Sequence, residues 1–275
     1  MVNESKFFKT LRYVFLILSV AFVIVPIVPT IFTALKTGAE YQATSVMSPP
    51  SNWLNTYNFT YALKAGTLLP SLGTTLIILA ISLIFSVNFA CMTSFVLQRF
   101  NFKLKGLIMA LYTATMFIPV VTTQVVVFRI MYYIGLVGNI GSLIILYSGT
   151  SIVDIYIVIN ILNSIPKDLD EAALLDGAGY FKIYFNIVFP LLKPAVATLA
   201  VIKGIGIYND FYVPNLYLIG NSRTLTIALY KFFRGQSTPF EVMSAAVLMA
   251  TIPVVIMFLF AQNYIYNGLA GAVKS

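Results

Sequence analysis

The sequence offers few residues that could carry out chemistry. It contains no histidine, which is the commonest general base and metal ligand, and one cysteine, Cys91. A lone cysteine excludes an intrachain disulfide and a cysteine-based zinc or iron–sulfur site, so we interpret Cys91 as a small apolar filler. We therefore expect no catalytic residue, no metal site and no cofactor in this chain.

Tyr208, Asn209 and Asp210 are candidates for contact with a polar solute, and Phe211 and Tyr212 follow them. A carboxylate and an amide flanked by aromatic rings can hydrogen-bond the hydroxyls of a sugar and cover its ring. The same residues are also typical of a tyrosine belt at the membrane interface or of a structural hydrogen bond. The sequence leaves both interpretations open.

Asp154 and Lys203 are the two charges deepest in apolar stretches. Asp154 precedes the inner end of the predicted fourth span by about eight residues, and Lys203 follows the inner start of the fifth by about nine. They therefore lie roughly 12 and 13.5 Å above the same membrane face. A charge at such depth costs about 2.5–3.5 kcal/mol and is usually paired or turned toward a cavity. We predict an ion pair that locks the two spans together or lines the solute path; Asp210 is the competing partner, but lies about 10.5 Å along the helix from Lys203.

The composition places these residues in a membrane. Hydrophobic residues make up 59% of the chain and charged residues 9%, whereas a soluble domain has about 25% charged residues. Since about 20 apolar residues cross the hydrocarbon core, the stretches between charges predict an all-α membrane protein with six transmembrane helices. The predicted spans are residues 13–35, 65–98, 106–128, 138–162, 194–214 and 240–264.

Basic residues predict the orientation. The inner segments hold more lysines and arginines, Arg99 among them, than the outer ones, which include Lys36, so we expect both termini in the cytoplasm of a multi-pass cell-membrane protein. The net charge of +8 then serves membrane topology rather than nucleic-acid binding. We expect a cytoplasmic tail at 1–12, a first transmembrane helix at 13–35, an extracellular loop at 36–67, the main transmembrane domain at 68–264 and a cytoplasmic tail at 265–275.

The longest inner connection, residues 163–193, has the pattern of a structured segment. Pro166 suits the first turn of a helix, and three acidic residues between positions 168 and 171 complement its positive end. Gly177 or Gly179 supplies a left-handed stop. The pattern predicts a short helix at 167–176 and a second helix along the membrane face at 180–190. An amphipathic interfacial connector would show the same pattern.

Six residues of this segment are spaced as in a known motif: Glu171, Ala172, Ala173, Gly177, Ile187 and Pro190. Their spacing resembles the EAA loop, Glu-Ala-Ala-x3-Gly-x9-Ile-x-Leu-Pro, of bacterial ABC importer permeases, with Phe189 where leucine is usual. Residues 164–166, 176–178, 209–211 and 268–274 extend the resemblance to carbohydrate permeases of the maltose-transporter type. The terminal match is one residue shorter than the form typical of that family.

The resemblance implies the transmembrane domain of a type I ABC importer for a carbohydrate, with an oligosaccharide favoured. It implies that 163–193 carries a cytoplasmic coupling helix that fits a groove of an ATPase. Under this interpretation the ATPase-coupling residues are Glu171, Ala172, Ala173, Leu174, Asp176 and Gly177. The substrate-path candidates are Asp154, Lys203, Tyr208, Asn209 and Asp210.

The resemblance also implies partners. They are a second, different permease chain, two ATP-binding subunits, an extracellular substrate-binding protein and the lipid bilayer, without nucleic acid. In such permeases the last outer loop reaches toward the binding protein, which makes contact candidates of Phe232, Phe233, Arg234 and Gln236. A partly buried loop anchor is the alternative for these four residues.

The energy source separates the leading hypothesis from its rival. The sequence has no Gly-x4-Gly-Lys-Ser/Thr motif, so we expect ATP hydrolysis by partner subunits and no enzymatic activity in this chain. The rival is an ion-coupled secondary transporter of a small polar solute, with Asp154 and Asp210 as coupling carboxylates. It requires an accidental EAA spacing and predicts inverted repeats, which the sequence does not show. A membrane-embedded enzyme is the weakest hypothesis.

Overall fold

The computed structural model describes residues 6–65, 67–219, 223–234 and 238–272. These residues form helices joined by turns and contain no strand, which confirms the all-α prediction. The chain divides into two compact units. Unit 1 comprises Met1–Leu69 and Ala228–Ile252, and unit 2 comprises Pro70–Ile227 and Pro253–Ser275.

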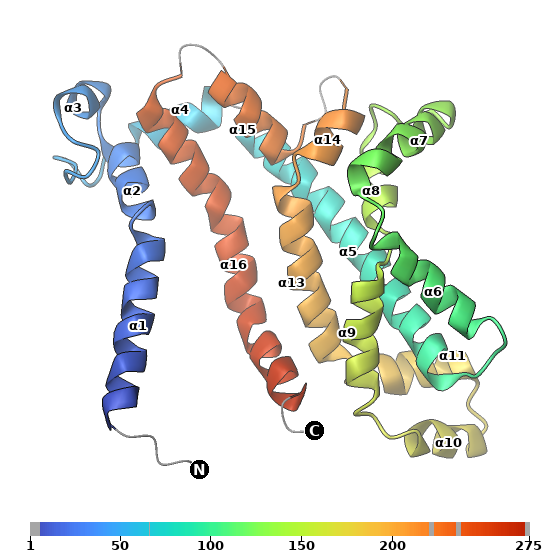
Figure 1. Ribbon diagram of the computed structural model, residues 1–275. Helices are drawn as coiled ribbons and strands as arrows, with labels where there is room; N and C mark the ends of the chain where they lie inside the picture. The colour runs from blue at the N-terminus through green and yellow to red at the C-terminus, as the bar shows by residue number, and fades with distance from the viewer. Residues whose placement is uncertain (1–5, 66, 220–222, 235–237, 273–275) are drawn as a thin grey trace. The chain divides into compact units, whose positions relative to one another are not determined.

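Unit 2 holds the residues of the predicted coupling segment and solute path (Figure 1). Its longest elements are α5 (Leu68–Arg99), α13 (Lys193–Asn209) and the second part of α16 (Phe240–Ala272). The shorter ones are α6 (Lys105–Thr115), α7 (Val120–Tyr133), α8 (Ile140–Tyr147), α9 (Ile152–Leu162), α10 (Asp168–Leu175), α11 (Tyr180–Ile183), the π-helical turn Tyr184–Val188, α12 (Phe189–Leu191) and α14 (Tyr212–Tyr217).

The core of unit 2 joins α5, α9, α13 and the turn that follows α11. One buried cluster contains Phe95 of α5, Val158 of α9, Tyr184 of the π-helical turn and Leu199 of α13. These side chains come from helices far apart in the sequence, and burial of their apolar surface holds the helices together. Ala173 of α10 belongs to the same cluster, so the inner segment is part of this core.

Two of the six predicted spans, 106–128 and 138–162, are broken helices, and a third bend lies where the helix predicted at 180–190 meets the predicted fifth span. Each pair has the length and hydropathy of one span, but α6 and α7 bend by 104°, α8 and α9 by 47°, and Tyr180–Leu191 and Lys193–Asn209 by 73°. The expected span at 106–128 is divided before Pro119, which has extended backbone and precedes α7. Proline lacks an N–H and disfavours helical backbone in the residue before it, which explains the break.

Stretches long and apolar enough to cross a membrane without a bend of more than 40° are Phe7–Leu35, which has a short turn at residues 25–26, Leu68–Arg99 and Phe240–Phe260. The described chain therefore has up to six spans when each bent pair counts as one, in agreement with the predicted number. Helix α16 continues to Ala272, through most of the segment expected as a tail at 265–275.

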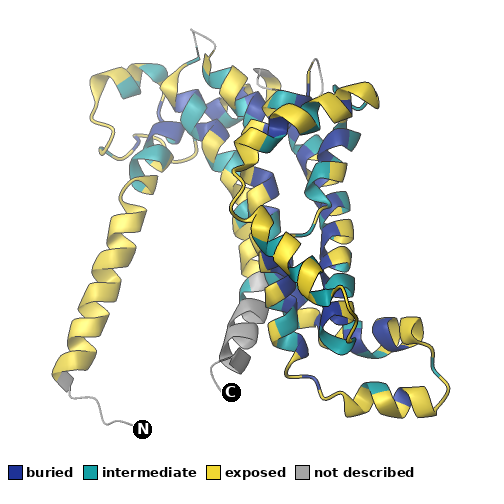
Figure 2. Ribbon diagram, turned by 45° about the vertical axis from the view of Figure 1, so that its right-hand side comes forward, coloured by how far each residue is buried: buried dark blue, intermediate teal, exposed yellow. Residues whose placement is uncertain are grey.

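Unit 1 contains α1 (Lys6–Ile24), α2 (Ile27–Leu35), α3 (Gly38–Ala43), α4 (Tyr57–Ala65), the end of α15 (Leu225–Arg234) and the start of α16. Helix α1 begins before the predicted residue 13, and Pro26 precedes α2 at the junction of the two helices. Figure 2 shows α1 exposed along its length. None of the most apolar 18-residue stretch within residues 7–35 is buried against other residues of the described chain.

The segment expected as an extracellular loop at 36–67 is internally bonded. The Lys36 side chain is fully buried, and its Nζ donates to Thr44 Oγ1 (2.9 Å) and to the Ser45 carbonyl (2.7 Å). The Asn58 amide donates to the carbonyls of Ala34 (2.9 Å) and Lys36 (2.7 Å). Lys36 was expected only as a charge flanking the membrane; its hydrogen bonds instead satisfy a buried ammonium.

We predict that Glu40 makes this segment sensitive to acid. The Ser51 N–H donates to Glu40 Oε1 (2.6 Å) and holds the pKa of that carboxyl below its usual range. Because the folded pKa is depressed, the stabilisation is present above the ordinary pKa and is lost as pH falls through the folded value. Hydrogen-exchange protection of the Ser51 amide should fall in that acid window.

Glu40→Gln serves as the control for this prediction. It should lower the protection of Ser51 at neutral pH and remove its acid dependence. Equal protection in the wild type and in the variant at every pH would show that the carboxylate does not hold the segment.

Candidate functional site

Helix α10 is a short helix that is terminated by a glycine in the left-handed conformation. Three acids, Asp168, Asp170 and Glu171, stand in its first turn, where they complement the positive helix end. After the helix, Gly177 adopts φ +80°, its N–H donates to the Leu174 carbonyl (3.0 Å), and the Ala178 N–H donates to the Ala173 carbonyl (2.9 Å). This pair of bonds around a left-handed glycine is a Schellman motif. The predicted helix and its glycine stop are confirmed, with Gly177 as the stop.

An ion pair fastens α10 to the end of α5. Arg99 Nε lies 2.7 Å from Asp170 Oδ2, and both side chains are largely buried. Arg99 Nη2 also donates to the Ile165 carbonyl (3.0 Å), and Gln98 Nε2 donates to Asn163 Oδ1 (3.1 Å). Removal of either partner of such a pair would leave an uncompensated charge with little exposure to solvent, which is strongly destabilising. The inner segment is therefore anchored to α5 at two places: in the residues that precede α10 and in α10 itself.

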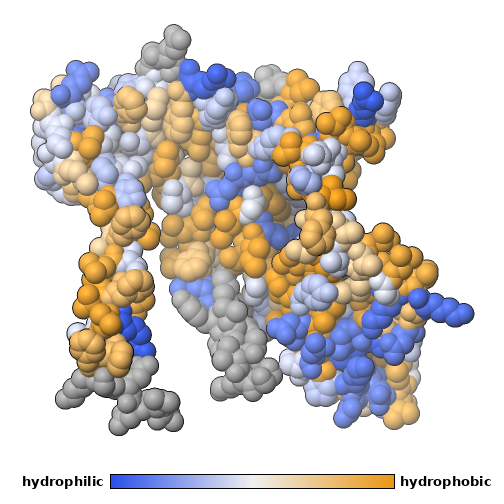
Figure 3. All heavy atoms as spheres, in the orientation of Figure 1, coloured by the Kyte–Doolittle hydropathy of each residue, from blue (hydrophilic) through white to orange (hydrophobic). Residues whose placement is uncertain are grey.

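The two faces of α10 differ. Ala173 is 9% exposed and lies in the core of unit 2, whereas Leu174 is 39% and Leu175 is 89% exposed. Glu171, Ala172, Asp176 and Gly177 are exposed. Figure 3 shows hydrophilic residues gathered around this end of unit 2. Ala173 differs from the expectation of a surface open to another protein, because its methyl group packs inside its own chain.

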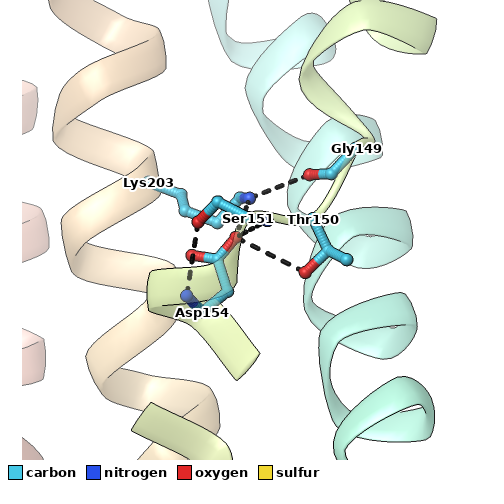
Figure 4. A network of polar contacts seen from close by, with 5 residues as sticks. All are labelled: Gly149, Thr150, Ser151, Asp154 and Lys203. Atoms are coloured by element: carbon cyan, nitrogen blue, oxygen red, sulfur yellow. Dashed lines mark hydrogen bonds and ion pairs between the residues drawn. The ribbon is translucent and has the colours of Figure 1, made fainter. Parts of the chain in front are cut away.

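Asp154 and Lys203 form the predicted ion pair (Figure 4). Lys203 Nζ lies 2.8 Å from Asp154 Oδ2 and donates to the Gly149 carbonyl at 3.0 Å. The pair joins α9 to α13, and the Asp154 side chain is 6% exposed. The predicted contact is confirmed, and it satisfies two charges that would be costly alone in an apolar region.

Asp154 also caps the N-terminal end of α9. The Ser151 N–H donates to Asp154 Oδ2 (2.7 Å), and the Asp154 N–H donates to Ser151 Oγ (3.3 Å), which is a capping box. Thr150 Oγ1 lies 3.4 Å from the same carboxylate oxygen. One carboxylate thus caps a helix at the break between α8 and α9 and binds an ammonium from α13.

The structure does not bring Asp210 to this pair. Asp210 ends α13, and its Oδ2 accepts a hydrogen bond from Tyr147 OH (2.7 Å) while its Oδ1 accepts one from the Val213 N–H (3.2 Å). Tyr208 is buried, and Asn209 Nδ2 donates to the Ile205 carbonyl of its own helix (3.0 Å). Asp210 therefore makes structural hydrogen bonds to α8 and α14.

The loop candidates lie at the end of α15 in unit 1. The rings of Phe232 and Phe233 are neighbours with centroids 6.2 Å apart, and both residues are partly buried. Arg234 is exposed, with its guanidinium carbon 5.3 Å from the centroid of the Tyr230 ring. Gln236 lies outside the described residues.

Sequence reasoning missed several residues that organise these sites. Arg99 was interpreted only as a topological charge, although it pairs with Asp170. Tyr147 was not singled out, although it binds Asp210. A signal was present for Ser151, because Ser-x-x-Asp is the spacing of a capping box. No comparable local signal links Arg99 to Asp170, which are distant in the sequence.

The arrangement suits mechanical and binding roles. Among the described residues, no group of three or more aspartate, glutamate or cysteine side chains could hold a metal ion. The built features are an anchored helix with an exposed acidic and apolar face, and an ion pair between two apolar helices. A rigid helix of this kind transmits displacement from one of its faces to the helices that anchor it.

Comparison with known proteins defines the class. Residues 87–270 match the family described as binding-protein-dependent transport system inner membrane component. The chain belongs to this family. It is therefore a multi-pass inner-membrane permease subunit of an ABC transporter.

Two relatives and one solved structure illustrate the similarity. The chain is 33% identical to the melibiose/raffinose/stachyose import permease protein MelC of Bacillus subtilis over 91% of each chain. It is 34% identical to the probable starch degradation products transport system permease protein AmyC of Thermoanaerobacterium thermosulfurigenes over 88% of each. The crystal structure of a bacterial ABC transporter involved in alginate import shares the fold, with a TM-score of 0.85, 20% identity and coverage of 96% of this chain and 100% of that one. The type I importer fold is confirmed.

We predict that the Asp154–Lys203 pair acts as a unit. Asp154→Asn and Lys203→Met should each lower the thermal stability of the purified protein, because loss of one partner of a buried ion pair costs roughly 3–5 kcal/mol. The double variant should recover part of this loss. Thermal unfolding in one detergent, run on the four proteins side by side, measures the coupling.

Ser151→Ala is the matched control, because it removes a cap and keeps both charges. It should cost about 1 kcal/mol and should not be rescued by Lys203→Met. Purely additive losses in the Asp154→Asn/Lys203→Met protein would show that the two charges act separately.

Proposed function

We propose that this chain is a permease subunit of an ATP-driven ABC importer that moves a carbohydrate, with an oligosaccharide as the favoured class. The observation that carries the proposal is α10, a capped helix that is anchored through Arg99 and Asp170 and presents an exposed face. The relatives named for melibiose, raffinose and stachyose and for starch degradation products support the carbohydrate class.

In this proposal α10 is the coupling helix. The exposure of Glu171, Ala172 and Leu174 supports contact with an ATPase subunit, and Gly177 fixes where the helix ends. Closure of the ATPases on ATP moves α10, and the Arg99–Asp170 ion pair passes this displacement to α5. Ala173 contributes to the same transmission through its packing in the core.

The partners follow from this mechanism. The chain pairs with a second, different permease, with two ATP-binding subunits and with an extracellular substrate-binding protein. Both termini and α10 lie in the cytoplasm, and residues 36–67 lie outside. The binding protein contacts the Phe232–Arg234 end of α15, and the partly exposed aromatic rings there support such a contact.

The solute path is assigned to unit 2. We place Asp154, Lys203, Tyr208, Asn209 and Asp210 beside it. The Asp154–Lys203 ion pair locks α9 to α13, and Asp210 fixes the junction of α13 and α14 through Tyr147 and Val213. These contacts support a role in shaping the path, with Asn209 as the exposed polar side chain.

Reconstitution tests the energy source. The chain is placed in vesicles with its partner permease, its ATPases and its binding protein, and uptake of a labelled oligosaccharide is measured with ATP or with an ion gradient. We expect uptake with ATP and none with the gradient alone. Uptake driven by the gradient without ATPase subunits would contradict the proposal and favour the secondary-transporter hypothesis.

We predict that Glu171→Lys and Gly177→Asp abolish ATP-driven uptake while the protein stays in the membrane. The first reverses a charge on the exposed face of α10, and the second forces a side chain into the left-handed conformation at φ +80°, at a cost of about 1–2 kcal/mol. Uptake by the reconstituted complex and the amount of membrane-inserted protein are measured together.

Gly179→Ala is the matched glycine control for this pair. An added Cβ at Gly179 meets no atom within 4 Å, and its φ is not in the left-handed region, so uptake should be unchanged. Normal uptake by both Glu171→Lys and Gly177→Asp would remove α10 from the mechanism.

A further inference from the structure

A cavity of about 430 Å³ lies within unit 1 and is separate from the coupling segment and the proposed solute path. It is lined by residues of 37–61 and by the start of α16. Its polar lining residues include Thr37, Asn55, Asn58, Tyr57, Tyr61 and Glu241. The volume is in the range of sites that bind a small ligand or a large side chain.

Glu241 is a buried residue whose carboxylate lines the cavity. It is 7% exposed, and it has no hydrogen bond or ion pair within the described residues. An added Cβ at Gly38 would lie 2.7 Å from Glu241 Oε1, so the glycine leaves the space that this carboxylate occupies. A buried carboxylate is costly unless it is paired, and this one lines a cavity that can admit a partner.

The two asparagines of the cavity present acceptors. Both N–H groups of the Asn58 amide donate to backbone carbonyls, which leaves its Oδ1 as the remaining polar atom. The Asn55 amide donates to the Leu35 carbonyl, and its Oδ1 accepts from the Tyr57 N–H. Lys36, a nearby cation in the sequence, has its Nζ bound to Thr44 and Ser45. The lining therefore offers one negative charge and several acceptor oxygens.

Aromatic and apolar residues surround this acceptor-rich lining. The rings of Tyr57 and Tyr61 have centroids 6.2 Å apart and supply faces that attract a cation. Leu54 is 87%, Tyr57 is 67% and Phe240 is 64% exposed, and they neighbour the lining residues in sequence. A polar cavity beside exposed apolar side chains is typical of a surface that receives a side chain from another protein.

We propose that this cavity receives the cationic head of an arginine or lysine side chain from a protein that docks on residues 37–61. Glu241 neutralises the cation, Asn58 Oδ1 accepts a hydrogen bond from it, and Tyr57 and Tyr61 cover it. The apolar neighbours contact the same partner around the cation. The inference goes beyond the proposed function, because the cavity recognises a protein side chain whatever solute is moved.

The test uses a matched pair of probes on the purified full-length chain. N-acetyl-arginine-methylamide carries the guanidinium, and N-acetyl-citrulline-methylamide is its uncharged isostere. Binding is titrated by calorimetry at low ionic strength. We expect saturable binding of the arginine probe and none of the citrulline probe. Equal binding of the two probes, or none of either, would overturn the proposal.

Substitutions locate the binding. Glu241→Gln should weaken arginine binding at least about tenfold, as expected for loss of a charge-assisted contact. Tyr57→Leu, at an exposed position, should weaken it about two- to fivefold through the lost cation–π contact. Tyr13→Leu, the same substitution at an exposed ring of the same unit outside the cavity, should leave binding unchanged. Unchanged binding in Glu241→Gln or in Tyr57→Leu would contradict the assignment.

Two further readouts separate this role from others. The Glu241→Gln protein should unfold at the same or a higher temperature than the wild type, because the substitution removes a buried charge. A lower unfolding temperature together with unchanged probe binding would assign Glu241 a purely structural role. Agmatine that binds more than about tenfold tighter than the capped arginine would reassign the cavity to a free amine. Binding is measured without transport, so this proposal and the proposed function fail separately.

Discussion

In so apolar a chain a charge left unsatisfied among the helices is costly, and two ion pairs between helices organise unit 2. The Asp154–Lys203 pair joins α9 to α13, and the Arg99–Asp170 pair joins α10 to α5. Each joins helices that are far apart in the sequence, and each is supported by a bond to a backbone carbonyl, Gly149 for Lys203 and Ile165 for Arg99. Unpaired, these groups would be costly, so the helices are held in one arrangement.

This constraint gives α10 its mechanical character. The Schellman motif at Gly177 ends the helix, the acids of its first turn favour its start, and the ion pair to Arg99 fixes it to α5. The buried methyl of Ala173 adds apolar contact on the inner face. A helix held by a charge and by packing moves with the element that it contacts, whereas a loop on the same connection would absorb the displacement. In the proposed mechanism, α10 and the end of α5 therefore move together.

The sequence predicted the features that depend on local chemistry. Proline, acids and glycine at fixed spacing located α10, and apolar length located the spans. Equal depth in antiparallel helices was enough to predict the Asp154–Lys203 contact, because few charges were available to pair. The bends within the third and fourth predicted spans were missed because hydropathy does not register where proline or a capping residue divides a span. The Arg99–Asp170 pair and the contacts of Asp210 were missed because they depend on tertiary packing, which brings distant side chains together.

The distance between α10 and α5 during turnover shows most directly whether the two helices move together. Spin labels at Leu175→Cys on α10 and Val96→Cys on α5, in a Cys91→Ala background, can be measured by pulsed electron paramagnetic resonance in the assembled transporter. The account predicts the same narrow distance distribution with ADP and with ATP trapped on the ATPases, and a broader one after Asp170→Asn. A distance that changes between the two nucleotide states in the protein with the intact ion pair would contradict it.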